Sequence, residues 1–205
     1  FGRGRWRRPS SFRGGGMEFP EFLILRHGET EWNREGRMQS SLDSPLTDKG
    51  RAQARRQNAI LREFGAEGWR WYASPQWRAM NTAQIAAHGS GSEITPDDRL
   101  REIGLGDWTG QLRSDIAAQV PHLFETDGLG WYDYAPGGEG LAALERRAAA
   151  FLADLTAPAV IVTHGITSRV IRCVAQGLPV DAFDTLGGGQ GVVYHICRGQ
   201  SELLA

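Results

Sequence analysis

Short, uninterrupted apolar runs are the strongest local pattern along the chain. Residues 22–25 (FLIL) and 160–162 (VIV) contain no polar side chain, as expected for strands that are buried on both faces. Residues 69–73 (WRWYA) predict another strand, which ends at a Ser-Pro pair. Residues 192–197 (VVYHIC) could add a last strand. The runs together predict a buried β-sheet.

Helical periodicity fills the stretches between these runs. It is clearest over residues 139–155, where large apolar side chains recur at three- and four-residue steps. Thr47 has the position of a helix N-cap and starts a predicted helix that runs through Phe64. Residues 76–88 and 168–176 predict two more helices. Strands that alternate with helices predict an α/β fold, a three-layer α/β/α sandwich with a mostly parallel central sheet.

Composition adds a domain boundary to this picture. A chain of 205 residues favours one domain. The net charge of -1 hides an asymmetry: the five arginines of residues 1–16 (FGRGRWRRPSSFRGGG) have no acid among them, so this segment is +5 and the remainder is -6. Its Arg, Gly and Ser content cannot bury a core. We expect residues 1–16 to be a disordered tail or an upstream remnant before Met17, and residues 17–205 to form the domain.

The same composition argues against several other classes of protein. Cys173 and Cys197 form no CxxC pair and no metal-ligand spacing, which predicts two thiols in a reducing compartment and no disulfide framework. No apolar run approaches the roughly 18 residues of a membrane span, and the basic N-terminus leads into three glycines rather than a signal core. We expect a soluble, cytoplasmic protein without a metal or cofactor.

Two histidines occupy equivalent places in the predicted sheet. His27 and His164 each follow an apolar strand, and each is followed by a glycine that lets a backbone amide approach a ligand. Because ligands of open α/β sheets bind at the carboxyl ends of strands, both histidines are expected in one crevice. With Arg26 beside them, they predict an anion site.

Around these histidines the sequence resembles the histidine phosphatase superfamily, which includes the phosphoglycerate mutases and many small-molecule phosphatases. Residues 26–33 (RHGETEWN) match its signature R-H-G-E-T-x-W-N. The resemblance extends from about residue 22 to residue 165 through five further ordered blocks: 36–47 (GRMQSSLDSPLT), 73–83 (ASPQWRAMNTA), 100–110 (LREIGLGDWTG), 136–139 (PGGE) and 162–165 (VTHG). It implies the phosphoglycerate mutase-like fold.

The resemblance also implies a phosphate site. His27 corresponds to a nucleophile that forms a phosphohistidine, and to attack it must present one unprotonated ring nitrogen while a backbone carbonyl holds the other as an N–H donor. Arg26 and Arg78 correspond to the arginines that clamp the phosphoryl oxygens, for which a guanidinium fork is well suited. Asn33 and the Gly165 amide are expected to donate to the same group.

Two more residues complete the predicted chemistry. His164 corresponds to the second histidine, which stabilises charge on the equatorial oxygens. Glu102 occupies the acid/base position, protonating the ester oxygen and then activating water. Gln39 is a candidate contact to the substrate. The aromatic loop residues Trp131, Tyr132 and Tyr134 could either contact substrate or pack over the core.

We expect a metal-independent phosphomonoester hydrolase acting on a small phosphorylated metabolite. A phosphoglycerate mutase is the alternative, but only about 28 residues separate Trp108 from Pro136, which leaves little room for the lid that keeps water from a phosphohistidine. Nucleic-acid binding through residues 1–16 is a distant alternative. Ser40 and Gly140 depart from the superfamily pattern, and the stretch 187–191 (GGGQG) lacks its asparagine, so the substrate stays open among sugar phosphates, phosphoglycerates, nucleotide-pathway intermediates and protein phosphohistidine.

Overall fold

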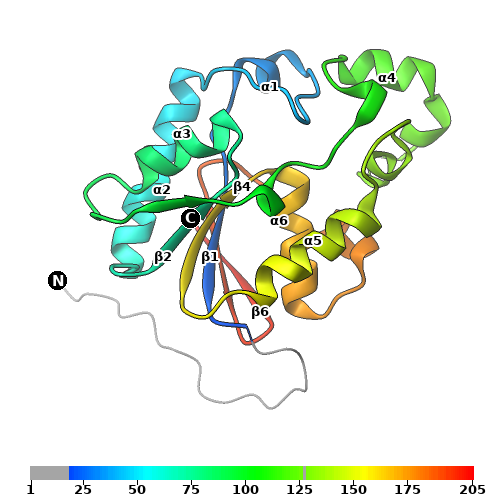
Figure 1. Ribbon diagram of the computed structural model, residues 1–205. Helices are drawn as coiled ribbons and strands as arrows, with labels where there is room; N and C mark the ends of the chain where they lie inside the picture. The colour runs from blue at the N-terminus through cyan, green and yellow to red at the C-terminus, as the bar shows by residue number, and fades with distance from the viewer. Residues whose placement is uncertain (1–18, 127) are drawn as a thin grey trace.

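The computed structural model describes residues 19–126 and 128–205 and contains one six-stranded sheet with helices on both sides (Figure 1). The strand order is β3-β2-β4-β1-β5-β6. The first four strands of this order run parallel, β5 pairs antiparallel with β1, and β6 pairs antiparallel with β5. The bounds are β1 Phe22–Arg26, β2 Arg70–Ala73, β3 Ile94–Pro96, β4 Ala159–Thr163, β5 Val193–Cys197 and β6 Gln200–Leu204.

Helices cover both faces of the sheet. Figure 1 shows α2 and α3 on one side of the sheet and α5 and α6 on the other. Helices α1 and α4 lie at the top of the view, beyond the carboxyl ends of the central strands. The α-helices are α1 Glu31–Glu35, α2 Asp48–Phe64, α3 Trp77–Ala86, α4 Arg113–Gln119, α5 Leu141–Ala153 and α6 Gly165–Gln176. Short 3-10 helices are η1 Asp98–Leu100, η2 Gly106–Trp108, η3 Pro121–Phe124, η4 Gly130–Tyr134 and η5 Val180–Thr185. The predicted three-layer sandwich is confirmed.

Strand β1 divides its side chains between two cores. Phe22 and Ile24 join the cluster packed against α5 and α6, whereas Leu23 and Leu25 join the cluster packed against α2 and α3. Successive side chains of a strand point to opposite faces, so a strand covered on both sides needs apolar residues at every position. This requirement is why the uninterrupted run at 22–25 identified a central strand.

The parallel pairing of β1 with β4 places the two histidines together. Arg26 is aligned with Thr163 in the register, and the next backbone amide, that of His27, donates to the Thr163 carbonyl at 2.9 Å. His27 and His164 therefore leave neighbouring strands at the same edge of the sheet.

Several predicted boundaries shift by a few residues. Thr47 caps α2, and its side-chain oxygen accepts from the Gly50 amide at 3.0 Å. The helix predicted from residue 168 begins at Gly165, so His164 is its N-cap residue. Strands β3 and β6 have no counterpart among the predicted elements, because these edge strands carry exposed polar residues and lack an apolar run.

Two other predictions concern the N-terminal segment and membrane-spanning helices. The proposed disordered tail, and nucleic-acid binding through it, fall on residues 1–16, which lie outside the described residues. Among the described helices, none combines the length and the hydropathy required to cross a membrane.

Candidate active site

His27 lies fully enclosed at the carboxyl end of β1. Its Nδ1 is 2.8 Å from the carbonyl oxygen of Gly28, which makes Nδ1 the protonated nitrogen and leaves a lone pair on Nε2. Burial lowers the pKa of His27 well below its usual 6.5, and the positive charges of Arg78 and Arg26 lower it further. The imidazole is thus neutral at neutral pH and carries an available nitrogen, as the chemistry expected from the sequence requires.

The turn after His27 depends on close backbone contact with the start of α2. A Cβ on Gly28 would lie 2.3 Å from the carbonyl oxygen of Gly50, and a Cβ on Gly50 would lie 2.0 Å from that of Glu29. Side chains at either position are excluded by these contacts. The Gly28 amide donates to the Thr82 hydroxyl at 3.0 Å, which ties the turn to α3. The two glycines therefore fix the carbonyl that orients His27.

His164 packs directly against His27. The ring centroids are 5.2 Å apart with an edge-on arrangement. The Ser74 hydroxyl lies 2.8 Å from Nε2 of His164, while Nδ1 is buried without a hydrogen-bond partner in the described structure. Burial lowers the pKa of His164 well below 6.5, and Arg78 and His27 add to the effect. The Ser74 hydroxyl also lies 3.4 Å from Gln76 Oε1; when its one proton goes to the closer Nε2, the neutral His164 ring carries its N–H at Nδ1.

Two arginines supply the positive charge of the site. Arg78 is buried and forms an ion pair with Asp43 at 2.7 Å, while its other guanidinium nitrogen donates to the Ser40 carbonyl at 2.9 Å. Burial lowers the pKa of Arg78, and Asp43 opposes the shift. Burial also lowers the pKa of Arg26, partly offset by Glu102. The Nε atoms of both arginines are buried without a partner among the described residues.

Asn33 is held by its amide oxygen. Oδ1 accepts from the Thr30 amide at 3.2 Å, within the capping box of α1, and from the side-chain amide of Gln190 at 3.1 Å. The side-chain NH2 is consequently the group of Asn33 that can donate to a ligand. Gln190 lies 157 residues away in the chain, within the stretch 187–191 that lacks the superfamily's asparagine.

Glu102 sits at the N-terminus of α6. Its Oε1 accepts from the amides of Ile103 at 3.1 Å and Thr167 at 3.0 Å, and also from the Thr167 hydroxyl at 3.0 Å. Oε2 has a single, longer contact, 3.3 Å from the Ile166 amide. Helix N-termini favour negative groups, so α6 anchors one oxygen of this carboxylate and leaves the other lightly held.

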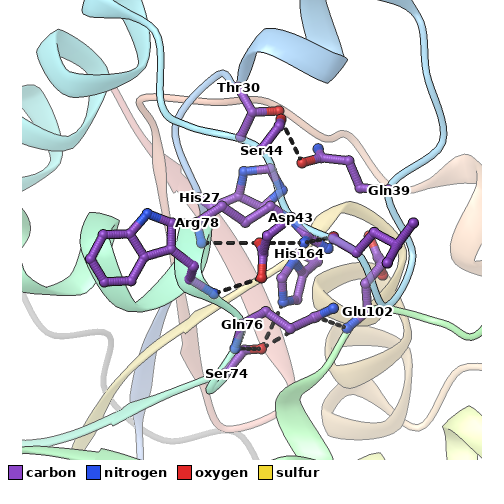
Figure 2. Close-up of polar contacts among 12 residues, drawn as sticks. His27, Thr30, Gln39, Asp43, Ser44, Ser74, Gln76, Arg78, Glu102 and His164 are labelled. Atoms are coloured by element: carbon purple, nitrogen blue, oxygen red, sulfur yellow. Dashed lines mark hydrogen bonds and ion pairs between the residues drawn. The ribbon is translucent and has the colours of Figure 1, made fainter. Parts of the chain in front are cut away.

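A cavity of about 200 Å³ lies over these groups. Six predicted site residues line it, namely Arg26, His27, Asn33, Gln39, Arg78 and Glu102. Figure 2 shows how His27, Arg78, Glu102 and His164 converge from different elements. His164 and Gly165 are not part of the lining: His164 lies beside His27, and Gly165 packs against Arg26, where a Cβ would be 3.3 Å from the guanidinium carbon.

The cavity has further lining residues to which the sequence assigns no role in the phosphate site. Arg37 and Arg113 reach the cavity, accompanied by Gly36, Met38, Ser40, Leu105 and Tyr132. Arg37 donates to the Gly110 carbonyl at 2.7 Å, and the Arg113 guanidinium lies over the Phe124 ring, 5.1 Å from its centroid. Arg37 lies within the block 36–47, but no sequence pattern assigns it to the cavity, and Arg113 lies outside the motif blocks, so only the fold identifies these two cations as part of the site.

Ser40 explains one departure from the superfamily pattern. Its φ is 47°, in the left-handed region that favours glycine. Serine persists there because its hydroxyl donates to the Ile103 carbonyl at 3.1 Å and accepts from the Leu105 amide at 2.9 Å. Its carbonyl also accepts from Gln76 and Arg78. Ser40 therefore joins Arg78 to the segment that carries Glu102.

The aromatic residues Trp131, Tyr132 and Tyr134 differ in their surroundings, and no single one of the two interpretations, substrate contact or core packing, fits them all. Trp131 is buried and stacks on Tyr132 with centroids 4.0 Å apart, so it packs in the core. Tyr132 lines the cavity, and burial raises its pKa. Tyr134 is exposed.

Known proteins with similar sequences share this site-bearing region. The family model described as "Histidine phosphatase superfamily (branch 1)" matches residues 22–203. The chain belongs to the histidine phosphatase superfamily. It is 33% identical to the glucosyl-3-phosphoglycerate phosphatase of Mycolicibacterium vanbaalenii, over 84% of this chain and 81% of the relative. It is 36% identical to a probable phosphoglycerate mutase of an Enterobacter species, over 79% and 77%.

Solved histidine phosphatase structures agree with the fold. A mycobacterial glucosyl-3-phosphoglycerate phosphatase in complex with VO3 superposes with a TM-score of 0.74 at 30% identity, covering 86% of this chain and 90% of that one. The superfamily relatives are phosphatases and phosphoglycerate mutase-like proteins, and membership supports phosphatase activity for this chain.

Proposed function

We propose that this chain hydrolyses phosphate monoesters through a phosphohistidine at His27, with no metal in the reaction. The observation that carries the proposal is the state of His27: it is buried and neutral, with Nδ1 donating to Gly28 and Nε2 free to attack. Around it, the Nε atoms of Arg26 and Arg78 and Nδ1 of His164 are buried polar atoms that have no partner among residues 19–126 and 128–205. Phosphoryl oxygens would satisfy all three.

In the first step, the Nε2 lone pair of His27 attacks phosphorus and the bond from phosphorus to the ester oxygen breaks. The phosphoryl oxygens are held by Arg26, Arg78 and the Asn33 amide, with His164 donating from Nδ1. Glu102 gives its proton to the departing alkoxide, which leaves as an alcohol. Oε2 suits this transfer, because Oε1 is occupied by two backbone amides.

In the second step, water attacks the phosphohistidine. The Glu102 carboxylate takes a proton from that water, the bond from phosphorus to Nε2 breaks, and the electron pair returns to His27. Inorganic phosphate leaves, and Glu102 is again protonated for the next cycle. One carboxylate thus serves as acid and then as base, and the protons balance over the cycle.

Two further arginines in the cavity lining favour a substrate with a second anionic group. Arg113 has no acidic partner among the described residues, while Arg37 shares the exposed carboxylate of Glu35. Both lie outside the cluster that holds the phosphoryl group. A carboxylate two or three atoms from the ester oxygen would meet them. Two of the similar proteins act on, or are named for, phosphoglycerates, which carry such a carboxylate.

A matched panel of phosphate monoesters tests the proposal. We expect an aryl phosphate, glycerol phosphate and phosphoglycerate all to release inorganic phosphate. Phosphoglycerate and glycerol phosphate form a matched pair, and phosphoglycerate, which carries the carboxylate, should be preferred. Activity should persist in chelator and fall by at least about 10³-fold in His27→Ala, but not in His88→Ala, which alters an exposed histidine.

Each alternative has its own signature in the same panel. Isomerised phosphoglycerate that exceeds free phosphate, especially with added bisphosphoglycerate, would identify a mutase. Chelator-sensitive turnover, or full turnover in His27→Ala, would refute the phosphohistidine route. Equal turnover of phosphoglycerate and glycerol phosphate would remove the carboxylate preference alone.

A further inference from the structure

A second group of chemically reactive side chains lies at the opposite end of β1. Glu21 immediately precedes β1, and the antiparallel neighbour β5 carries His195 and Cys197. Leu23 is aligned with His195 in the register. Since alternate residues of a strand share a face, Glu21 lies on the same face as Leu23, and Cys197 on the same face as His195. The pairing therefore gathers a carboxylate, an imidazole and a thiol.

The three side chains are close enough to share one ion. One ligand atom from each residue lies within 4.8 Å of the other two, and Nε2 of His195 is 3.2 Å from Oε2 of Glu21. All three residues are partly buried. The Phe64 ring packs on the His195 imidazole with centroids 4.7 Å apart, which restricts the orientation of the imidazole and limits its contact with water.

We propose that Glu21, His195 and Cys197 bind a zinc-like divalent ion. Thiolate, imidazole and carboxylate are the ligands that Zn2+ prefers, whereas Mg2+ and Ca2+ select oxygen-only sets. At ordinary zinc distances, nitrogen and oxygen ligands at tetrahedral angles are about 3.3 Å apart. The 3.2 Å between Nε2 of His195 and Oε2 of Glu21 is close to this value, and the Cys197 sulfur lies within 4.8 Å of both atoms, so the three residues would supply three corners.

A fourth ligand is available next to the group. Glu202 of β6 is aligned directly with His195, and residues opposite each other in an antiparallel pair project to the same face. Glu202 is exposed. Either its carboxylate or a water molecule would occupy the remaining corner, and the ion would then join β1, β5 and β6.

This position assigns the ion a structural role. Glu21 and His27 are separated by six residues of extended chain, about 20 Å at roughly 3.3 Å per residue, so an ion at Glu21 is remote from phosphoryl transfer. It would fasten the β5–β6 hairpin, which forms the edge of the sheet, to the beginning of the central strand. Metal binding is expected to raise thermal stability without changing turnover, and it does not depend on the proposed phosphatase reaction.

Binding also has a proton balance that can be measured. The Cys197 thiol loses its proton as the bond from sulfur to the metal forms, and at neutral pH this proton passes to the buffer. An oxidised sulfur no longer offers a thiolate. The reduced protein is therefore the form that binds.

The test uses the untagged, reduced full chain with Co2+ and Zn2+ as probes. We expect Co2+ to produce the thiolate-to-cobalt charge-transfer absorption, with one ion bound per chain, one proton released, and displacement by Zn2+. Zn2+ should raise the melting temperature and leave phosphatase turnover unchanged. Cys197→Ala, His195→Ala and Glu21→Gln should each lose or weaken binding.

Cys173→Ala is the matched control, because Cys173 is the other cysteine and lies buried in α6. It should retain the cobalt spectrum and the zinc-induced shift in melting temperature. Phosphatase turnover and circular dichroism report whether each variant is folded. Absence of the charge-transfer band in the folded wild-type chain, or a band that survives Cys197→Ala, would overturn the proposal. Loss of turnover on chelation would instead contradict the metal-free reaction proposed above.

Discussion

His27 owes its expected reactivity to two features that act on different parts of the imidazole. Burial and the charges of Arg78 and Arg26 keep the ring neutral by lowering its pKa. The Gly28 carbonyl decides which nitrogen carries the proton. The motif R-H-G specifies the residue, but the protonation state arises from enclosure between strand ends and helices. Chemistry at this scale is a property of the environment as much as of the side chain.

Glu102 is expected to matter most for substrates with poor leaving groups. Glu102→Gln removes the transferable proton, so attack on glycerol phosphate should slow by about 10²- to 10⁴-fold. With p-nitrophenyl phosphate the loss should be much smaller, since that phenolate leaves without protonation. Single-turnover release of the alcohol or phenol measures the first step separately from the attack of water.

Glu139→Gln provides the comparison for this experiment. Glu139 lies near Glu102 in the fold, but its carboxylate pairs with Arg147 at 2.6 Å and accepts from the Gly104 amide. Any loss in this variant should be the same for both substrates. Equal losses for both substrates in Glu102→Gln would argue against a role in leaving-group protonation.

Among the elements, α6 organises more of the site than its sequence indicates. Its N-terminus receives Glu102, and its first turns project arginines toward the loop of residues 186–191. Arg169 donates to the Leu186 carbonyl at 3.0 Å, and Arg172 donates to that of Gly187. Burial lowers the pKa of Arg172 to about 10, and its guanidinium lies over the Tyr194 ring. The loop is thereby held where Gln190 reaches Asn33.

Gln190 is expected to act as a positioning residue for Asn33. Gln190→Ala removes one of the two hydrogen bonds that orient the Asn33 amide, and kcat/KM should fall by about three- to tenfold, the value of one such bond. A double-mutant cycle measures the coupling: the loss should disappear in the Asn33→Ala background. An undiminished effect in that background would show that Gln190 acts on some other part of the fold.

At the scale of the whole molecule, the charge of the site has the opposite sign to the net charge of the chain. The described domain buries Arg78 and two neutral histidines and partly buries Arg26, in a chain whose formal net charge is -1. Enclosing cations costs free energy, which Asp43 and Glu102 partly offset. A local cationic site inside an acidic chain suits a dianionic ligand better than the total charge suggests.

The two enclosed histidines should make stability depend on pH. Both have pKa values lowered well below 6.5, so the unfolded chain binds protons below about pH 6.5 while the folded chain does not. Stability is then complete above pH 6.5 and falls as the pH decreases, by about 1.4 kcal/mol per pH unit for each histidine.

Urea unfolding at pH 7, 6 and 5 measures this dependence. His164→Gln should reduce the slope by about half, whatever its effect on stability at pH 7. A wild-type free energy of unfolding that stays constant from pH 7 to pH 5 would contradict the expectation of two neutral, enclosed rings.

The sequence by itself determined the central sheet, the main helices and the family. Strands buried on both faces must be apolar at every position, and motif residues such as Arg26 and His27 are adjacent in the chain, so both leave local signals. The edge strands left none, because an exposed edge tolerates polar residues.

Only the tertiary structure decided which distant residues complete each site. Arg113 joins the cavity lining, Gln190 contacts Asn33, and Glu21 lies beside His195 and Cys197, all across separations that no local sequence pattern records. The strained φ of Ser40 is likewise tolerated only because its hydroxyl meets residues 103 and 105. Periodicity reports which face of an element is buried, whereas the partners on that face are set by strand order and register. The physical reason is that tertiary packing brings side chains into contact that are far apart in the sequence, and the residues next to each one carry no information about its partner.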